Sequence, residues 1–143
     1  MYTRSRKESH LQTVQYEIDM LLFCFERLPK RITECQRQQY LVLEGFLLHY
    51  RNLVEFFSGS HHRHENDLSM RKPSVWAAHV TITMNQMKAI TQSAKHLDKK
   101  YFVPISRYLQ HCTEDRHLRD LTWDCQQMHD EILPIISMFH ALS

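Results

Sequence analysis

The stretch YLVLEGFLLHYRNLVEFF, residues 40–57, is apolar on nearly every side when it is wound as a helix. A helix that is hydrophobic all round lies at the buried centre of a fold. The same stretch carries five polar side chains, those of Glu44, His49, Arg51, Asn52 and Glu55. Buried polar groups must find hydrogen-bond partners or they lower stability. The stretch therefore predicts the core helix of a bundle and indicates a polar site along it.

Two long helices are predicted in the first half of the chain. From Ser9 to Leu28, apolar residues recur at alternating steps of three and four, which gives one apolar stripe. Pro29 ends this helix because it cannot continue the hydrogen-bond ladder. Thr33 and Gln36 match a capping box, in which the hydroxyl and the amide satisfy each other's backbone donors. We therefore expect the second helix to run from Thr33 to about Phe57.

The second half predicts further helices after a long polar connection. Apolar residues recur at steps of four and three from Trp76 to Leu97, and Tyr101–His111 follows as a short helix broken near Pro104. Thr113 can cap the last helix, in which Pro134 predicts a kink or a break. One face of that helix is lined by Leu118, Leu121, Cys125, Met128, Ile132, Ile135, Phe139 and Leu142.

Length and composition agree with a helical protein. The 143 residues include only 2 glycines and 4 prolines, which favours few, long elements. A chain of this length is expected to form one domain, residues 1–143, with one core. The prediction is an all-α, up-and-down four-helix bundle with one short additional helix, as a monomer or a homodimer.

Net charge and cysteine content limit the binding partners and the cellular compartment that we expect for this chain. The formal net charge of +2 is too small to argue for a nucleic-acid partner by itself. The basic residues Arg4, Arg6 and Lys7 are interpreted as a solvated tail, with a binding arm as the alternative. The 4 cysteines lack CxxC spacing, which favours reduced thiols in a cytoplasmic protein. The N-terminus has no signal-peptide pattern, and the run 20–25 is too short to span a bilayer, so we expect no membrane partner.

The polar residues of 40–57 fall on two stripes of the predicted helix. Glu44, Arg51 and Glu55 form one stripe, and His49 and Asn52 lie on another. Each stripe has a structural interpretation beside a functional one. Arg51 and Glu55 are spaced for an ion pair one turn apart, and His49 and Asn52 for a hydrogen-bonded core pair.

Arg51-Asn52 on the second long helix resembles the Arg-polar start of the motif in HEPN domains. That resemblance implies a four-helix bundle that acts as a metal-independent ribonuclease, serves a nucleotidyltransferase partner or is an inert module. The family's histidine follows after four to six intervening residues, and those positions here are Phe56, Phe57 and Ser58. His49, or His96 from the third helix, would have to take its place.

The run from Glu44 to Leu53, EGFLLHYRNL, is also similar to a group of short, uncharacterised bacterial helical proteins. In them a Lys/Ala-His-Leu element follows at the end of a later helix, as Lys95-His96-Leu97 does here. This likeness covers the second and third helices and carries no known function.

The candidate site residues follow from these patterns. In cleavage of RNA without metal, His49 or His96 would move a proton, Arg51 would hold the phosphorane charge, and Asn52 would orient either group. Glu44 and Glu55 are the candidate binding residues beside them. The competing interpretation is a non-catalytic interaction module, with RNA or a partner protein as ligand, in which these residues are structural.

A metal-binding bundle is the third alternative. The loop 58–74 contains the donors His61, His62, His64, Glu65 and Asp67, but no rigid ligand spacing such as HExxH. Glu114–His117 fits one Glu-x-x-His unit of a diiron bundle, and no second copy occurs. We therefore expect solvated loop histidines, no metal ligands and no cofactor.

Overall fold

The computed structural model describes residues 4–28, 36–61, 64–110 and 123–142, and every regular element within these ranges is helical. The all-α class is confirmed, and the up-and-down bundle order stays a prediction. The elements are α1 (Arg4–Arg27), α2 (Gln36–Ser58), α3 (Pro73–Trp76), α4 (Met84–Leu97), the π-helical turn η2 (Asp98–Phe102), α5 (Val103–Gln110) and α6 (Cys125–His140).

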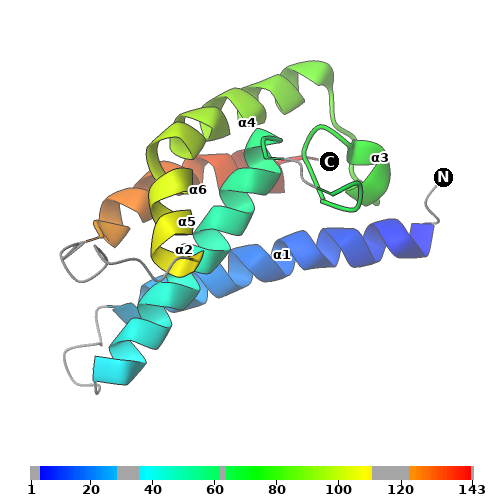
Figure 1. Cartoon of the computed structure of the whole chain (residues 1–143). Helices are drawn as coiled ribbons and strands as arrows, with labels where there is room; N and C mark the ends of the chain where they lie inside the picture. Colours follow the sequence, from blue (N-terminus) through cyan, green and yellow to red (C-terminus); the bar gives the residue numbers. More distant parts are fainter. Residues whose placement is uncertain (1–3, 29–35, 62–63, 111–122, 143) are drawn as a thin grey trace.

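Helix α2 lies between α1 and α4 and packs against both (Figure 1). Its C-terminal part also meets η2 and α5, while α6 packs against α4 and α1. The short α3 packs on α1, and its Trp76 ring contacts that of Phe139 in α6. The second half of α2 is therefore surrounded by helices, as expected for a core helix.

Four aromatic side chains from three elements form the centre of the core. Phe56 and Phe57 of α2, Trp76 of α3 and Phe139 of α6 are 0–6% exposed. Their rings pack with centroids 5.4–5.8 Å apart. Such offset and edge-on pairs add to the stabilisation from burial alone.

The first half of α2 is less buried than its sequence predicts. Leu41 is 70% exposed and Leu48 is 42% exposed, although both belong to the apolar stretch 40–57. Gly45 lies on the side that faces α1, where an added Cβ would be 3.0 Å from the Cys24 sulfur. Close contact of α1 and α2 explains this glycine, and the other side of α2 in this region stays open to solvent.

The first helix has the predicted apolar stripe but begins earlier than predicted. Val14, Ile18 and Leu21 are buried, and α1 already starts at Arg4 instead of Ser9. The basic N-terminal residues that we interpreted as a solvated tail therefore belong to a helix. The predicted cap at Thr33 lies outside the described residues.

The predicted third helix is divided in two, and that prediction was wrong. Pro73 occupies the first turn of α3, which ends at Trp76. Thr83 then caps α4 in a full capping box with Gln86. Residues of one apparent apolar stripe can thus lie on two helices, because a capping box within the stripe marks the start of a second helix.

Neither Pro104 nor Pro134 interrupts the run of helical residues, so the break predicted near Pro104 is absent, and the kink or break predicted at Pro134 is not a break. Pro104 is the second residue of α5, and the chain stays helical from Met84 to Gln110 through η2. A π-helical turn disturbs the regular ladder, so it accommodates a proline that lacks an N–H and crowds the preceding carbonyl. Pro134 is exposed within the continuous α6, whose start is capped by Asp124. The cap predicted at Thr113 lies outside the described residues.

The connection after α2 is packed and not simply solvated. Met70 is fully buried, and its N–H donates to the carbonyl of Phe56 over 3.0 Å. Ser69 is also buried, and its carbonyl accepts the Trp76 indole N–H at 2.7 Å. This segment therefore links α2 to α3. Within the described ranges, no helix combines the length and the hydropathy that a bilayer crossing needs.

Candidate functional site

His49 and Asn52 of the predicted site face α1, where they share one carboxylate. The Nδ1 atom of His49 lies 2.6 Å from one Glu17 oxygen, and the Asn52 amide donates to the other at 3.3 Å. His49 is only 8% exposed, and Tyr16 packs edge-on against its ring. The hydrogen-bonded pair predicted for His49 and Asn52 thus takes the form of a bridge through Glu17.

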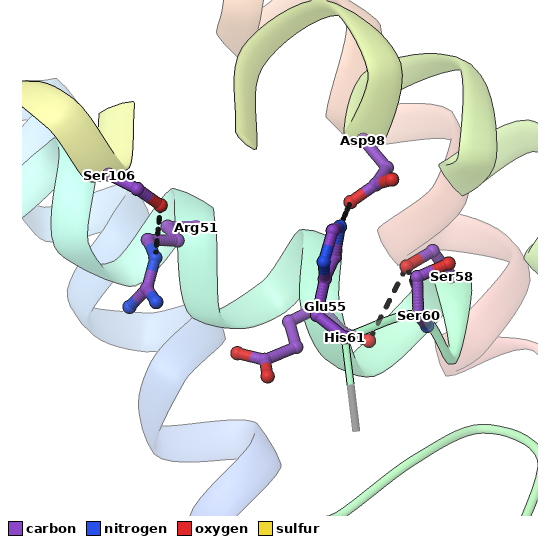
Figure 2. A network of polar contacts seen from close by, with 7 residues as sticks. All are labelled: Arg51, Glu55, Ser58, Ser60, His61, Asp98 and Ser106. Atoms are coloured by element: carbon purple, nitrogen blue, oxygen red, sulfur yellow. Dashed lines mark hydrogen bonds and ion pairs between the residues drawn. The ribbon is translucent and has the colours of Figure 1, made fainter. Parts of the chain in front are cut away.

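Arg51 points to a different set of helices. Its Nε donates to the hydroxyl of Ser106 in α5 at 2.9 Å (Figure 2). Its guanidinium carbon lies 5.0 Å from the ring centre of Phe102 in η2. Among the described residues, no ion pair joins Arg51 to Glu55 one turn away. Arg51 therefore links α2 to the η2–α5 segment through these two contacts.

The structure does not bring the predicted catalytic residues into one set of contacts. His49 and Asn52 bind at the α1 side of α2, Arg51 binds at the α5 side, and His96 is exposed on α4. The contacts of Arg51 within the described chain are with Ser106 and Phe102 and not with His96. Glu44 and Glu55, the predicted binding residues, are half-buried on α2.

A polar pair that the sequence analysis missed lies near Arg51. His61 Nε2 is 2.7 Å from the Asp98 carboxylate (Figure 2). The imidazole stacks on Phe102 with centroids 3.8 Å apart and planes at 2°. Phe102 therefore contacts both His61 and Arg51. The sequence places His61 in a polar loop 37 positions before Asp98, and no local signal joins the two.

A small acidic cavity of about 200 Å³ opens between α1, α2 and the connection that follows α2. Three carboxylates border it, those of Glu17, Glu55 and Asp67, together with the Asn52 amide. Thr13, Val14, Leu53, Phe56 and Leu68 complete its wall. Two residues of the predicted site, Asn52 and Glu55, line this cavity beside the Glu17 bridge. Arg51 and His96 are not part of its described lining.

The loop donors do not assemble into a metal site in the part of the chain that is described. There, no group of three or more His, Cys, Asp or Glu side chains is placed to hold a metal ion. His61 binds Asp98, and the Asp67 carboxylate accepts the backbone N–H of His64 at 3.2 Å. His62 and Glu114–His117 lie outside the described residues.

A separate polar cluster joins η2 to α6. Tyr101 donates to Glu131 at 2.6 Å, and the Lys100 ammonium lies 3.1 and 3.3 Å from the two oxygens of the same carboxylate. Partial burial raises the pKa of Glu131, but the hydrogen bonds from Tyr101 and Lys100 outweigh it and hold that pKa below its ordinary value. Burial raises the pKa of Tyr50, whose ring packs edge-on against Tyr101. Glu131 is thus the anionic centre of this junction.

We expect the stabilisation from Glu131 to disappear in acid. Because the folded-state pKa of Glu131 lies below the unfolded value of about 4.3, the contribution is present above that pH and is lost as the pH falls through the folded pKa. Urea unfolding of wild type and Glu131→Gln between about pH 7 and pH 3 should show a stability difference that shrinks towards acid. A difference that stays constant over this range would show that Glu131 titrates alike in both states.

Comparison of the chain with protein-family models, with curated proteins and with solved structures finds no match. The resemblance to HEPN domains therefore rests on the Arg51-Asn52 pattern and the helical prediction alone.

Proposed function

We propose that this chain is a small HEPN-like helical module, with an up-and-down bundle order, that acts by binding a partner and not by cleaving RNA. The observation that carries the proposal is the separate engagement of His49 and Arg51. His49 is tied to Glu17 on one side of α2, and Arg51 is tied to Ser106 on another.

Metal-free cleavage of RNA needs a proton-transfer group and a cationic clamp around the same phosphate. A general base must come within hydrogen-bond reach of the proton it takes, and the clamp must reach the phosphorane formed in the same step. The buried His49 imidazole uses Nδ1 to join two helices, and its ring is covered by Tyr16. These placements support structural roles for the residues that resemble the family motif.

The proposal predicts that Arg51 contributes to stability and not to catalysis. Arg51→Ala removes one hydrogen bond and one cation–π contact, so we expect a loss of about 1–2 kcal/mol in the free energy of unfolding. Arg107→Ala, an exposed arginine on α5, is the control and should change stability by less than about 0.5 kcal/mol. Urea unfolding followed by circular dichroism measures both.

Incubation of the wild type with structured and unstructured RNAs in EDTA tests the same proposal directly. We expect no cleavage by the wild type or by Arg51→Ala. Cleavage by the wild type that disappears in a stably folded Arg51→Ala variant would overturn the proposal.

Metal-independent endoribonuclease activity is the second candidate, and the His61–Asp98 pair favours it. A carboxylate that binds one imidazole nitrogen orients the ring and supports its protonated form, as a general acid or base requires. Phe102 lies against both His61 and Arg51, and the guanidinium carries further N–H donors besides the one that Ser106 accepts. His61 would then replace the histidine that is absent from residues 56–58.

Two histidine variants separate the candidates. If His61 takes part in cleavage, His61→Ala and Asp98→Asn abolish an EDTA-resistant activity, while His49→Ala changes stability but leaves the specific activity of the folded fraction unchanged. If all variants and the wild type lack cleavage, the binding module is supported.

A further inference from the structure

A basic groove runs along α4 on a part of the surface that the predicted site does not use. Its volume is about 440 Å³, and three of its lining side chains are cationic: Arg71, Lys88 and Lys95. The rest of its lining is uncharged and consists of Met84, Met87, Thr91 and Gln92. Because the described residues of its lining include three cations and no carboxylate, the groove has a positive potential that attracts anions.

The lysines of the groove form a row because of their spacing on α4. Lys88, Gln92 and Lys95 are separated by four and three residues, so they lie on one face of the helix over two turns. The two lysines are thus about 10 Å apart along the axis. α4 contains no aspartate or glutamate, and both lysines are exposed. No acidic residue of this helix therefore neutralises the row.

Arg71 reaches the groove from the segment after α2, which holds it in place. The backbone N–H of Arg71 donates to the Ser69 hydroxyl, and the adjacent Met70 is fixed to the carbonyl of Phe56. Its side chain crosses directly over Gly59, where a Cβ would come within 2.7 Å of its Cγ, Cδ and Nε. Gly59 has φ +66°, so both the turn and the passage of Arg71 suit glycine.

We infer that this groove binds the phosphodiester backbone of a single-stranded nucleic acid, for which RNA is the probe. Cations spread over two helical turns match a row of phosphates better than one compact anion. Gln92 can donate hydrogen bonds to phosphate or sugar oxygens, and Met84 and Met87 offer apolar surface to bases. The hydroxyl of the buried Thr91 instead donates to the carbonyl of Lys88. The inference rests on the proposed binding role of the chain and names its ligand and its surface.

Fluorescence anisotropy of a labelled single-stranded RNA of about twelve nucleotides, titrated with the full chain, tests the inference. With three phosphate contacts, the logarithm of the association constant should fall with the logarithm of salt concentration with a slope of about −2. Lys88→Gln/Lys95→Gln should weaken binding about 10-fold at low salt and bring the slope to about −0.7. Arg71→Gln should weaken binding by a smaller factor of about 3.

The control is Arg6→Gln/Arg107→Gln, which removes the same charge from exposed positions of α1 and α5. We expect its affinity to remain within about 2-fold of the wild type. An equal loss in both double variants would overturn the inference, because binding would then follow net charge and not the groove. Circular dichroism confirms that each variant is folded.

Parallel titrations identify the source of the phosphate. A DNA strand of the same sequence should bind with similar affinity, since the groove reads the backbone. Binding to phosphatidylcholine–phosphatidylserine vesicles without binding to RNA would overturn the inference in favour of a membrane surface. A wild-type chain that neither binds nor cleaves RNA overturns the groove inference alone, whereas EDTA-resistant cleavage overturns the proposed function alone.

Discussion

Replacement of Trp76 by alanine is expected to lower the free energy of unfolding by about 3–5 kcal/mol, the range for truncating a buried aromatic side chain. Trp76 is fully buried, and its ring packs on Phe56 and Phe139 with both centroids 5.5 Å away. Its indole N–H also satisfies the carbonyl of the buried Ser69. Truncation therefore leaves a cavity where three segments meet and removes the donor from a buried acceptor.

Two further variants make the Trp76 result specific. Trp76→Phe keeps most of the apolar volume but loses the donor, so its loss should be smaller, about 1–3 kcal/mol. Met84→Ala removes an apolar side chain that is 61% exposed and should change stability by less than about 0.5 kcal/mol. Urea unfolding should be followed by circular dichroism, because the substitution removes a fluorophore. Equal losses for Trp76→Ala and Met84→Ala would contradict the described core.

Glu17→Ala is expected to produce the next largest effect, a loss of about 2–3 kcal/mol. Glu17 is the common partner of His49 and Asn52, so its removal takes the acceptor from two donors at once. Because His49 is 8% exposed, water cannot fully replace the carboxylate without local opening of the α1–α2 contact. The measurement is the urea midpoint, together with hydrogen exchange of the α2 amides near Asn52.

A neighbouring carboxylate provides the matched control. Asp19 is exposed on the same helix, and its carboxylate accepts a hydrogen bond from the Gln15 amide one turn away, so Asp19→Ala should change stability by less than about 0.5 kcal/mol. Glu17→Gln keeps an acceptor oxygen and should lose about half as much as Glu17→Ala. If Glu17→Ala were as stable as Asp19→Ala, the bridge would not contribute, and the structural role of His49 would lose its support.

The residues of the predicted site lie on different sides of α2, and the helical pattern of the sequence predicted these residues but not their partners. The sequence identified α2 as the helix that carries the important polar residues, and each of His49, Arg51 and Asn52 has a partner on another helix. The partners themselves, Glu17 and Ser106, could not be predicted, because the pairing depends on how α1 and α5 dock against α2. Arg51 and His49 therefore carry the family resemblance without sharing a site.

The helical class and most of the buried core residues could be predicted from the sequence. Apolar spacing predicted the buried positions of α1 and α6, because that spacing reflects the helix period and little else. It failed where two helices shared one apparent stripe, although the Thr83–Gln86 capping box was visible in the sequence. Tertiary structure alone decided which polar groups meet. It joined His61 to Asp98 and His49 to Glu17, and it placed Arg71 in the groove that the lysines of α4 also line, because these arrangements depend on distances between segments that no local pattern encodes.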